Sequence, residues 1–275
     1  MLKIPQLLEV RRLAALIAIV LLSGCSNCNV PAFHAGAPRP IPGATPPPPG
    51  ATPPPVALSC AQNAITGQGV PLGSAATFAV LAASTVTNSG PTIVTGDLGV
   101  SPGTAVTGFN AGPGTGTVTG GSIHAGDPTA AQAQLDLTTA FNNAAGRANP
   151  TAVPSDIGGT VIPPGVYKAP VSLAITGNAT LDGQNNPNSV FIFQVASTLT
   201  TSTNSAVTLI NSANACNVFW EVGSSATLNT ASIFNGNILA QASISLGTGA
   251  PVNGRVLART GAVTLLSNTV TRAGP

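Results

Sequence analysis

Short runs of alternating apolar and polar residues return at regular intervals in the second half of the chain. Residues 235–240 (NGNILA) recur as residues 253–258 (NGRVLA), an offset of 18. Residues 191–195 (FIFQV) align with residues 218–222 (VFWEV), an offset of 27. These segments are rich in β-branched and aromatic residues and are separated by Gly, Asn and Ser, a pattern typical of short strands.

A fixed period of this size indicates a solenoid, in which each repeat buries its apolar face against its neighbours. Eighteen residues suffice for one turn of three short strands, and a turn with a longer loop accounts for 27. A Greek-key sandwich is the alternative all-β fold. It does not explain strands that recur at a near-constant interval, so the pattern favours a parallel β-helix.

Leucines mark the same position of successive repeats. Leu246 follows Leu228 by 18 residues, and Leu265 follows after 19. A small hydroxyl residue precedes each leucine: Thr227, Ser245 and Thr264. This alternation predicts strands in which one of every two neighbouring side chains points into the narrow interior of the solenoid.

One segment departs from the strand pattern. Asp127 followed by Pro128 is typical of a helix N-terminus, and no Gly or Pro follows until Gly146. Apolar residues at helical spacing form one stripe: Leu137, Ala140, Phe141 and Ala144. We expect a helix over about 128–145, lying along one face of the solenoid with this stripe inward.

The first 24 residues have the organisation of an export signal. Lys3, Arg11 and Arg12 precede a ten-residue apolar run at 13–22, which is too short to cross a membrane as a helix. The run ends in Leu-Ser-Gly-Cys, which resembles the bacterial lipobox, and this makes Cys25 the expected lipidation site. An ordinary secretory signal cut nearby is the alternative. Both predict an extracellular or cell-surface protein, and lipidation predicts an anchor in the outer membrane.

Composition divides the chain into three parts: the signal (1–24), a Pro-rich tether (25–58) and a β-helix domain (59–275). The tether contains two near-copies of GATPPP, at 43–48 and 50–55. Such a segment favours extended polyproline II, with a rise of about 3.1 Å per residue. It is therefore expected to hold the domain away from the membrane.

Three cysteines remain besides Cys25, and an oxidising compartment favours a disulfide between two of them. Cys28 lies next to the membrane in the tether. Cys60 opens the predicted domain and Cys216 directly precedes a strong strand. The expected pair is therefore Cys60–Cys216.

The exported part carries almost no net charge. Only 6% of the residues are charged, against about 25% in a typical soluble domain. Three of the nine basic residues and one of the seven acidic residues lie in the signal, which leaves six of each sign. Nucleic acid is excluded as a partner, because duplex binding needs clustered Lys and Arg.

No catalytic constellation or metal-ligand spacing stands out in the sequence. A zinc site is the alternative use of the cysteines, but their spacing does not match and the only histidines are His34 and His124. We therefore expect no cofactor, no metal and no enzyme. Six carboxylates follow the signal, and none is paired within a strand's reach in sequence: Asp97, Asp127, Asp136, Asp156, Asp182 and Glu221.

Ordered motifs extend over the predicted domain: LGSAATFAVLA (72–82), GDLGVSPG (96–103), AAGR (144–147), PGVY (164–167), VFIFQ (190–194), NVFW (217–220) and NGR (253–255). Together they resemble the large microbial ice-binding (antifreeze) protein family. The resemblance implies a right-handed, discontinuous β-helix of triangular cross-section with one α-helix alongside. It also implies that the N-terminal strands complete a coil next to the C-terminal ones. Some members carry a capping insertion before the helix, whereas residues 111–121 here are only a Gly- and Thr-rich stretch.

The resemblance implies ice as the ligand, bound by a monomer through a flat face rich in Thr, Ser and Ala. Adsorption would inhibit crystal growth and recrystallisation, or would anchor the cell to ice. Stretches similar to the family's Thr-rich motif follow the leucine of each repeat, so we expect them to stack as rows on one face. The expected ice-binding residues are Thr201, Thr203, Asn204, Thr230, Ser232, Thr248, Ala250, Ser267 and Thr269.

The alternative function is a surface adhesin or structural lipoprotein that binds a polysaccharide or another cell. Carbohydrate sites usually expose aromatic platforms. After Cys25 the only Trp and Tyr are Trp220 and Tyr167, and both belong to motifs with a structural pattern.

Overall fold

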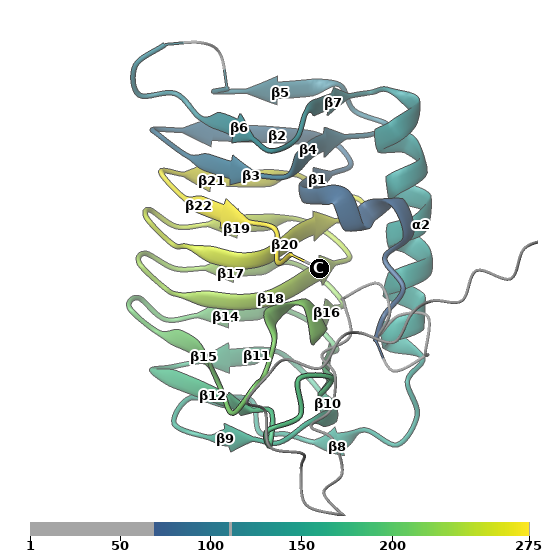
Figure 1. Cartoon of the computed structure of the whole chain (residues 1–275), viewed down its shortest axis with the longest axis vertical. Coiled ribbons are helices and arrows are strands. Elements are labelled where there is room, and N and C mark those ends of the chain that lie inside the picture. Colours follow the sequence, from purple (N-terminus) through teal and green to yellow (C-terminus); the bar gives the residue numbers. More distant parts are fainter. Residues whose placement is uncertain (1–68, 110–111, 275) are drawn as a thin grey trace, which may run out of the picture. The chain divides into compact units, whose positions relative to one another are not determined.

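The computed structural model describes residues 69–109 and 112–274, which form a parallel β-solenoid with one long helix at its side (Figure 1). We name its three faces A, B and C, in the order in which each coil of chain visits them. Face A contains β1 (Phe78–Ala82), β4 (Asp97–Val100), β7 (Ile123–Ala125), β8 (Thr151–Ala152), β10 (Gly165–Ala169), β13 (Phe191–Val195), β16 (Val218–Val222) and the second halves of β18 (Phe234–Ala240) and β20 (Val252–Ala258).

Face B contains β2 (Thr85–Ser89), β5 (Ala105–Thr107), β11 (Leu173–Ile175), β14 (Leu199–Thr201), β17 (Ala226–Leu228), β19 (Ile244–Leu246) and β21 (Val263–Leu266). Face C contains β3 (Ile93–Thr95), β6 (Thr117–Thr119), β9 (Val161–Ile162), β12 (Asn178–Asp182), β15 (Ala206–Ile210), β22 (Thr269–Thr271) and the first halves of β18 and β20. Two short 3-10 helices, η1 (Gly73–Thr77) and η2 (Ala215–Asn217), complete the elements besides α2 (Pro128–Ala145).

The strand registers confirm the predicted solenoid and its repeat. Asn235 pairs with Asn253 across β18 and β20, which is the offset of 18 seen in the sequence. Phe191 pairs with Val218 across β13 and β16, which is the offset of 27. Because all pairings are parallel and link equivalent positions of successive coils, the Greek-key alternative is wrong.

The N-terminal coil is inserted into the stack beside the C-terminal one, as the family resemblance implied. β1 pairs with β20 on one side and β4 on the other. β2 lies between β21 and β5 in the same way, and β3 lies between β22 and β6. In Figure 1 the N-terminal strands therefore stand directly above the C-terminal ones.

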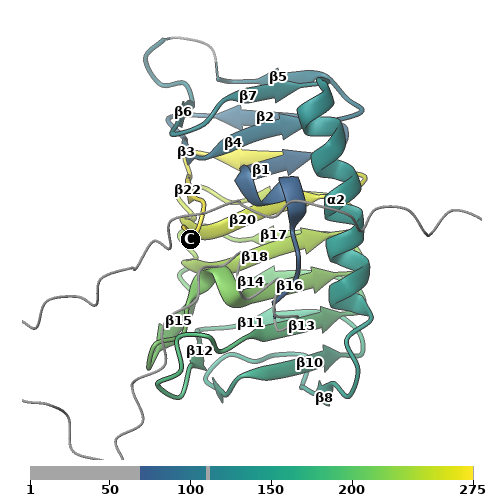
Figure 2. The same cartoon turned by 45° about the vertical axis from the view of Figure 1, so that its right-hand side comes forward.

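Helix α2 has the predicted bounds and covers face A. The Asp127 side chain caps it by accepting a hydrogen bond from the Ala130 amide at 2.9 Å. The predicted stripe is buried, and it meets an outward apolar layer of face A that includes Phe219 and Leu239. Figure 2 shows α2 running along the strands of this face. Face A is thus closed to solvent along the helix.

The interior of the solenoid is filled by side chains from all three faces. Tyr167, Phe193 and Trp220 stack on successive coils, with ring centroids 5.3 Å and 4.0 Å apart. The buried indole nitrogen of Trp220 donates to the Asn235 carbonyl at 3.1 Å, which satisfies its one polar atom. The inward positions are therefore apolar through every coil, while the outward positions are apolar on face A under the helix and polar or small on face B.

The Asn-Gly pairs of the 18-residue repeat form a corner between two faces. Gly236 and Gly254 lie where β18 and β20 turn from face C to face A, with φ of 118° and 153°. A Cβ at Gly254 would overlap the carbonyl oxygen of Gly236 in the neighbouring coil. Glycine is required there because neighbouring backbones approach closely in this conformation.

The expected signal and most of the tether, including Cys25, lie outside the described residues. Within the part of the chain that the structure describes, no helix is long and apolar enough to cross a membrane.

Candidate functional site

A row of small outward residues, one from each of the seven strands, runs along face B. In six of the strands this outward residue stands between two side chains that point into the solenoid, as in β17, where Thr227 lies between the buried Ala226 and Leu228. In β5 it is Thr107, which is followed by Gly108. Strand pairing places these outward residues in register from one end of the face to the other. We call this row the face B ladder: Ala174, Thr200, Thr227, Ser245, Thr264, Thr87 and Thr107.

A second outward row runs beside the ladder, and some of its side chains form hydrogen bonds with the neighbouring coil. The hydroxyl of Thr198 donates to that of Ser172 at 2.8 Å, and Ser225 Oγ accepts the Ser243 amide at 3.3 Å. These bonds, with that from the Ala262 amide to Ser243 Oγ at 3.2 Å, link three pairs of neighbouring coils along the row. Its members are Ser172, Thr198, Ser225, Ser243, Ala262, Thr85 and Ala105.

The hydroxyls in the middle of the face B ladder are available to solvent. Thr200, Thr227 and Ser245 are exposed, and within the described residues no hydrogen bond is recorded for their side chains, nor for those of Thr264 and Thr87. None of the seven strands carries a charged residue. The face can therefore order water only through hydroxyl and methyl groups at fixed positions.

The geometry of this face is set by the backbone. Neighbouring strands of a sheet lie about 4.7–4.9 Å apart, and alternate residues along a strand are about 6.6–6.8 Å apart. Two outward rows over seven strands thus form a regular grid. Thr favours strands because its branched side chain packs well on a pleated surface, which also holds each hydroxyl in a restricted set of positions.

Most of the residues predicted as ice-binding lie elsewhere, at the corner between faces B and C. Left-handed residues turn the chain there in successive coils, and they include Asn204 (φ 58°), Ala231 (φ 56°), Gly249 (φ 67°) and Ser267 (φ 52°). Thr203, Asn204, Thr230 and Thr248 are exposed at this corner, Ser267 is half-buried, and Thr269 is exposed on face C. The expectation that all nine stack on one face is wrong: most of them lie in the corner turn, Thr201 ends β14 with its side chain buried, and Thr269 belongs to β22 on face C.

Three of the predicted residues are buried and cannot touch a crystal. Thr201 is 1% exposed, and Ser232 and Ala250 are 0% exposed. The Thr201 hydroxyl donates to Ser232 Oγ at 2.9 Å and accepts the Asn229 amide at 2.9 Å. These side chains hold the corner together. The sequence did contain the signal for the outward row, since Thr227, Ser245 and Thr264 directly precede the leucines of the repeat.

Other chemistry within the described residues is sparse. They contain no group of three His, Cys, Asp or Glu side chains that could hold a metal ion. The closest titratable pair is His124 Nδ1 and Asp127 Oδ2, 2.7 Å apart at the start of α2. Trp220 and Tyr167 are both buried, at 0% and 7% exposure, so neither offers an aromatic platform.

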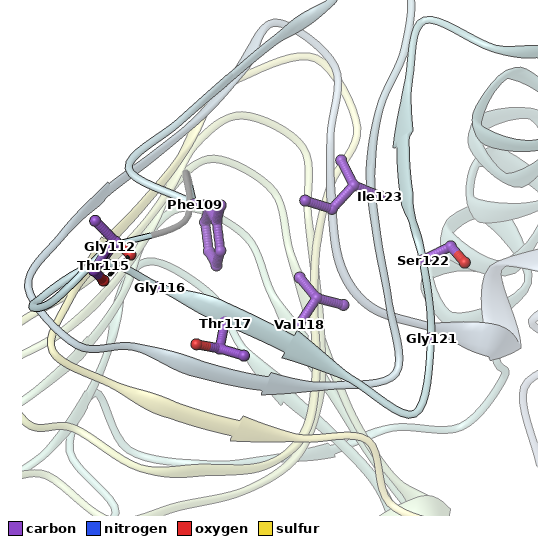
Figure 3. A pocket seen from close by; sticks show the side chains of 9 residues that line it. All are labelled: Phe109, Gly112, Thr115, Gly116, Thr117, Val118, Gly121, Ser122 and Ile123. Carbon is purple, nitrogen blue, oxygen red and sulfur yellow. Dashed lines mark hydrogen bonds between the residues drawn. The ribbon is translucent and has the colours of Figure 1, made fainter.

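A hollow of about 410 Å³ lies at the open end of the solenoid. Figure 3 shows Phe109, Val118 and Ile123 pointing across it from the last coil. The lining has no charged side chain, and the hollow exists because the coil of β5, β6 and β7 has no further coil above it. It is a consequence of the coil geometry, and we assign it no ligand.

Cys216 forms a disulfide. It is 2% exposed in η2, directly before β16. Cys25, Cys28 and Cys60 all lie outside the described residues, so pairing with Cys60 stays a prediction.

These observations define a class of protein: a β-solenoid with one face covered by a helix and another face that presents small, uncharged side chains in register. The sequence profile of the family described as Ice-binding-like matches residues 80–271. The chain belongs to this family.

Individual relatives agree with this assignment. An ice-binding protein of Nostoc sp. (strain HG1) is 47% identical over 204 residues, which is 74% of each chain. The crystal structure of an ice-binding protein from an Antarctic biological consortium is 45% identical, with a TM-score of 0.70 over 74% of this chain and 90% of its own. The ice-binding protein of the Antarctic ascomycete Antarctomyces psychrotrophicus is 43% identical, with a TM-score of 0.69 over 74% of this chain and 98% of its own.

Proposed function

We propose that this protein binds ice through face B. The observation that carries the proposal is the seven-step face B ladder, in which small residues, mostly hydroxyl-bearing, stand in register with no charge among them. The ice-binding proteins to which the chain is similar support ice as the ligand. Adsorption involves no covalent step and no cofactor.

The physical basis is the ordering of water by a repeating surface. Methyl groups of Thr and Ala exclude water from the spaces between strands, while the hydroxyls anchor it at fixed intervals. A charged side chain would orient water around itself, and a long side chain would move over several positions. A grid of small groups can instead hold an ice-like layer that merges with the crystal. Bound protein would then inhibit growth and recrystallisation, or attach the cell to ice.

The site of action follows from the N-terminal segment. The protein is exported, is lipidated on Cys25 and acts as a monomer at the cell surface, held away from the membrane by residues 25–58. The apolar run before Cys25 and the prolines after it support this arrangement. Replacing Cys25 with Ala should move the protein out of the detergent phase in a detergent-partition assay. Unchanged partitioning would exclude the lipid anchor.

The ice-binding proposal is tested by substituting one exposed ladder residue. Thr227→Tyr places a bulky ring on the grid, so the crystal can no longer approach the neighbouring hydroxyls. Ice-affinity partitioning and thermal hysteresis should both fall, while circular dichroism stays unchanged because a surface substitution usually alters stability by about 0.5 kcal/mol or less. The matched control is Thr139→Tyr on the exposed side of α2, which should bind ice normally. If the wild-type protein stays in the liquid during ice-affinity partitioning, the proposed ice-binding function itself is wrong.

A further inference from the structure

The face B ladder has one further position, in the coil that contains β8 and β9 and lies at the lower end of Figure 1. The Ala174 amide donates to the Ser155 carbonyl at 2.7 Å, and the Ile157 amide donates to the Ala174 carbonyl at 3.1 Å. This bridge places Asp156 in register with Ala174. Ile157 and Ile175 both belong to the buried core, so Asp156 takes the outward position next to Ala174.

The side chain of Asp156 is fixed at this position. Its Oδ1 atom accepts the Gly158 amide at 2.8 Å and the Thr176 amide at 3.1 Å, and its Oδ2 atom accepts the Thr176 hydroxyl. Partial burial raises the pKa of Asp156, but these hydrogen bonds outweigh it and hold the pKa below its usual value. A negative charge therefore stands at one end of the row at neutral pH, one strand spacing of about 4.7–4.9 Å from Ala174.

The opposite end of the face B ladder carries no such charge. Its last two members are Thr87 and Thr107, which lie in register on β2 and β5. At the Asp156 end, Pro154 is exposed two residues earlier in the chain. Proline and charged residues also protect sheet edges from pairing with other chains, so edge protection is the alternative role of this coil.

A carboxylate and a hydroxyl order water in different ways. A hydroxyl both donates and accepts hydrogen bonds, so it can take the place of a water molecule in an ice-like layer, whereas an ionised carboxylate only accepts. Its hydrogen bonds are also shorter and stronger than those of neutral groups. The nearest waters therefore direct their hydrogens toward the carboxylate and do not follow the lattice. Ala174, the ladder member next to Asp156, is also the one member of the seven without a hydroxyl.

We propose that Asp156 sets the end of the ice-contact surface, so that ice meets face B from Thr200 to Thr107 and not the coil beyond. The inference rests on the proposed function and adds the residue that limits it. The extent of the contact is then determined by a charge as well as by the number of coils. Removal of this charge should let the ice-like layer extend over Ala174.

The test is a double-mutant cycle in the full-length protein. Asp156→Asn removes the charge and keeps an acceptor for the two amides, and Ala174→Thr supplies the hydroxyl that this position lacks. Asp182→Asn is the matched control, because it removes a carboxylate at the end of β12 on face C and keeps an acceptor for the Gln184 amide. Ice-affinity partitioning and thermal hysteresis are measured for each variant. Circular dichroism, melting and the oligomeric state are recorded beside them.

We expect the variant with both Asp156→Asn and Ala174→Thr to partition into ice about threefold more strongly than wild type, a difference of about 0.6 kcal/mol. Its thermal hysteresis should rise as well. Ala174→Thr alone should change little, because the carboxylate still orients the water beside it. Asp182→Asn should match wild type.

Several results would overturn the inference. A folded double variant without a gain shows that the charge does not limit the contact, and so does a full gain from Ala174→Thr alone, which does not depend on how Asp156→Asn folds. A gain in Asp182→Asn would make net charge the cause, and a gain that accompanies self-association would assign Asp156 to edge protection. The proposed function is judged separately, by the partitioning of the wild type and of Thr227→Tyr.

Discussion

Arg255 donates a hydrogen bond to the side-chain oxygen of Asn237 at 2.8 Å, and the two residues face each other in register on β20 and β18. They occupy the same position of the 18-residue repeat, where one coil has Asn and the next has Arg. The guanidinium also donates to the carbonyls of Ala76 at 2.8 Å and Ala273 at 3.3 Å. Arg255 is 3% exposed, so it joins the N-terminal segment, the C-terminal segment and the repeat from inside the protein.

Replacing Arg255 with Ala should therefore destabilise the whole solenoid. The change leaves the buried amide oxygen of Asn237 and the buried carbonyl of Ala273 without their donor, and it leaves the Ala76 carbonyl with only the longer bond from Arg272 at 3.4 Å. We expect a loss of about 3 kcal/mol or more in the free energy of unfolding. Arg255→Lys keeps the charge but loses the fork of donors, so it should lose part of this stability. Chemical denaturation measures both. Equal stability of Arg255→Ala and wild type would contradict the role given to these bonds.

Stability should fall as the pH rises through neutrality because of Glu221. Burial beside α2 raises the pKa of Glu221 to about 7, although the nearby cations Arg259 and Lys168 act in the opposite direction. The folded protein therefore favours protonated Glu221. The stability that this preference adds is fully present below the unfolded pKa of about 4.5 and is lost as the pH rises past the folded pKa of about 7. The loss is at most about 3 kcal/mol, or about 2–4 °C in Tm for each kcal/mol.

Melting curves between pH 4 and 9 test this expectation, with Glu221→Gln as the matched variant. Gln keeps the shape of the side chain and cannot ionise. Every other ionisable group is present in both proteins. The difference between the two curves isolates Glu221. A wild-type Tm that stays parallel to that of the variant across this range would refute the assignment.

Thr201→Val should weaken the fold and leave ice binding intact. The variant keeps the branched shape but removes the acceptor of the Asn229 amide and the donor to Ser232. An unsatisfied buried group costs about 1–3 kcal/mol, which denaturation can detect. Ice-affinity partitioning, measured where both proteins are folded, should be unchanged. A variant of normal stability that no longer binds ice would return Thr201 to the ice-contact residues.

The disulfide of Cys216 should connect to Cys60. Both belong to the predicted domain, whereas Cys28 belongs to the tether. Removal of a native disulfide typically costs about 2–5 kcal/mol, so Cys60→Ser and Cys216→Ser should be destabilised by the same amount. Peptide mapping without reductant identifies the pair directly. A peptide that joins Cys28 to Cys216 would show that the tether is fastened to the solenoid instead.

The sequence was sufficient for most of the fold because the relevant signals are local or periodic. Asp127, Pro128 and Gly146 mark the helix, and the offsets of 18 and 27 mark the stacking of coils. The pairing of β1 with β20 joins residues 176 positions apart in the sequence, such as Val80 and Val256. No periodicity indicates this contact, and it was expected only from the family resemblance.

The outward row that we propose as the ice-binding surface was predicted less well, for a geometric reason. Thr200 and Thr201 are adjacent and chemically identical, but one points to solvent and the other into the corner. In a strand the side-chain period is two, so an error of one residue exchanges inside and outside. The leucines of the repeat fix that phase, since Leu228, Leu246 and Leu265 are buried. The residue directly before each leucine therefore points outward, as Thr227 and Ser245 do, and the residues after each leucine lead into the corner.

The insertion of the first coil beside the last one restricts how such a protein can lengthen in evolution. Both described chain ends lie in the middle of the stack, since β1 pairs with β20 and β22 pairs with β3. Residues added after β22 therefore cannot add a further strand to the stack at that position, because β3 already occupies the neighbouring strand position. Duplication of an 18-residue unit can enlarge the surface only from within the chain, and α2 must then grow or slide to span the longer face A. The size of the surface is thereby tied to the length of one helix.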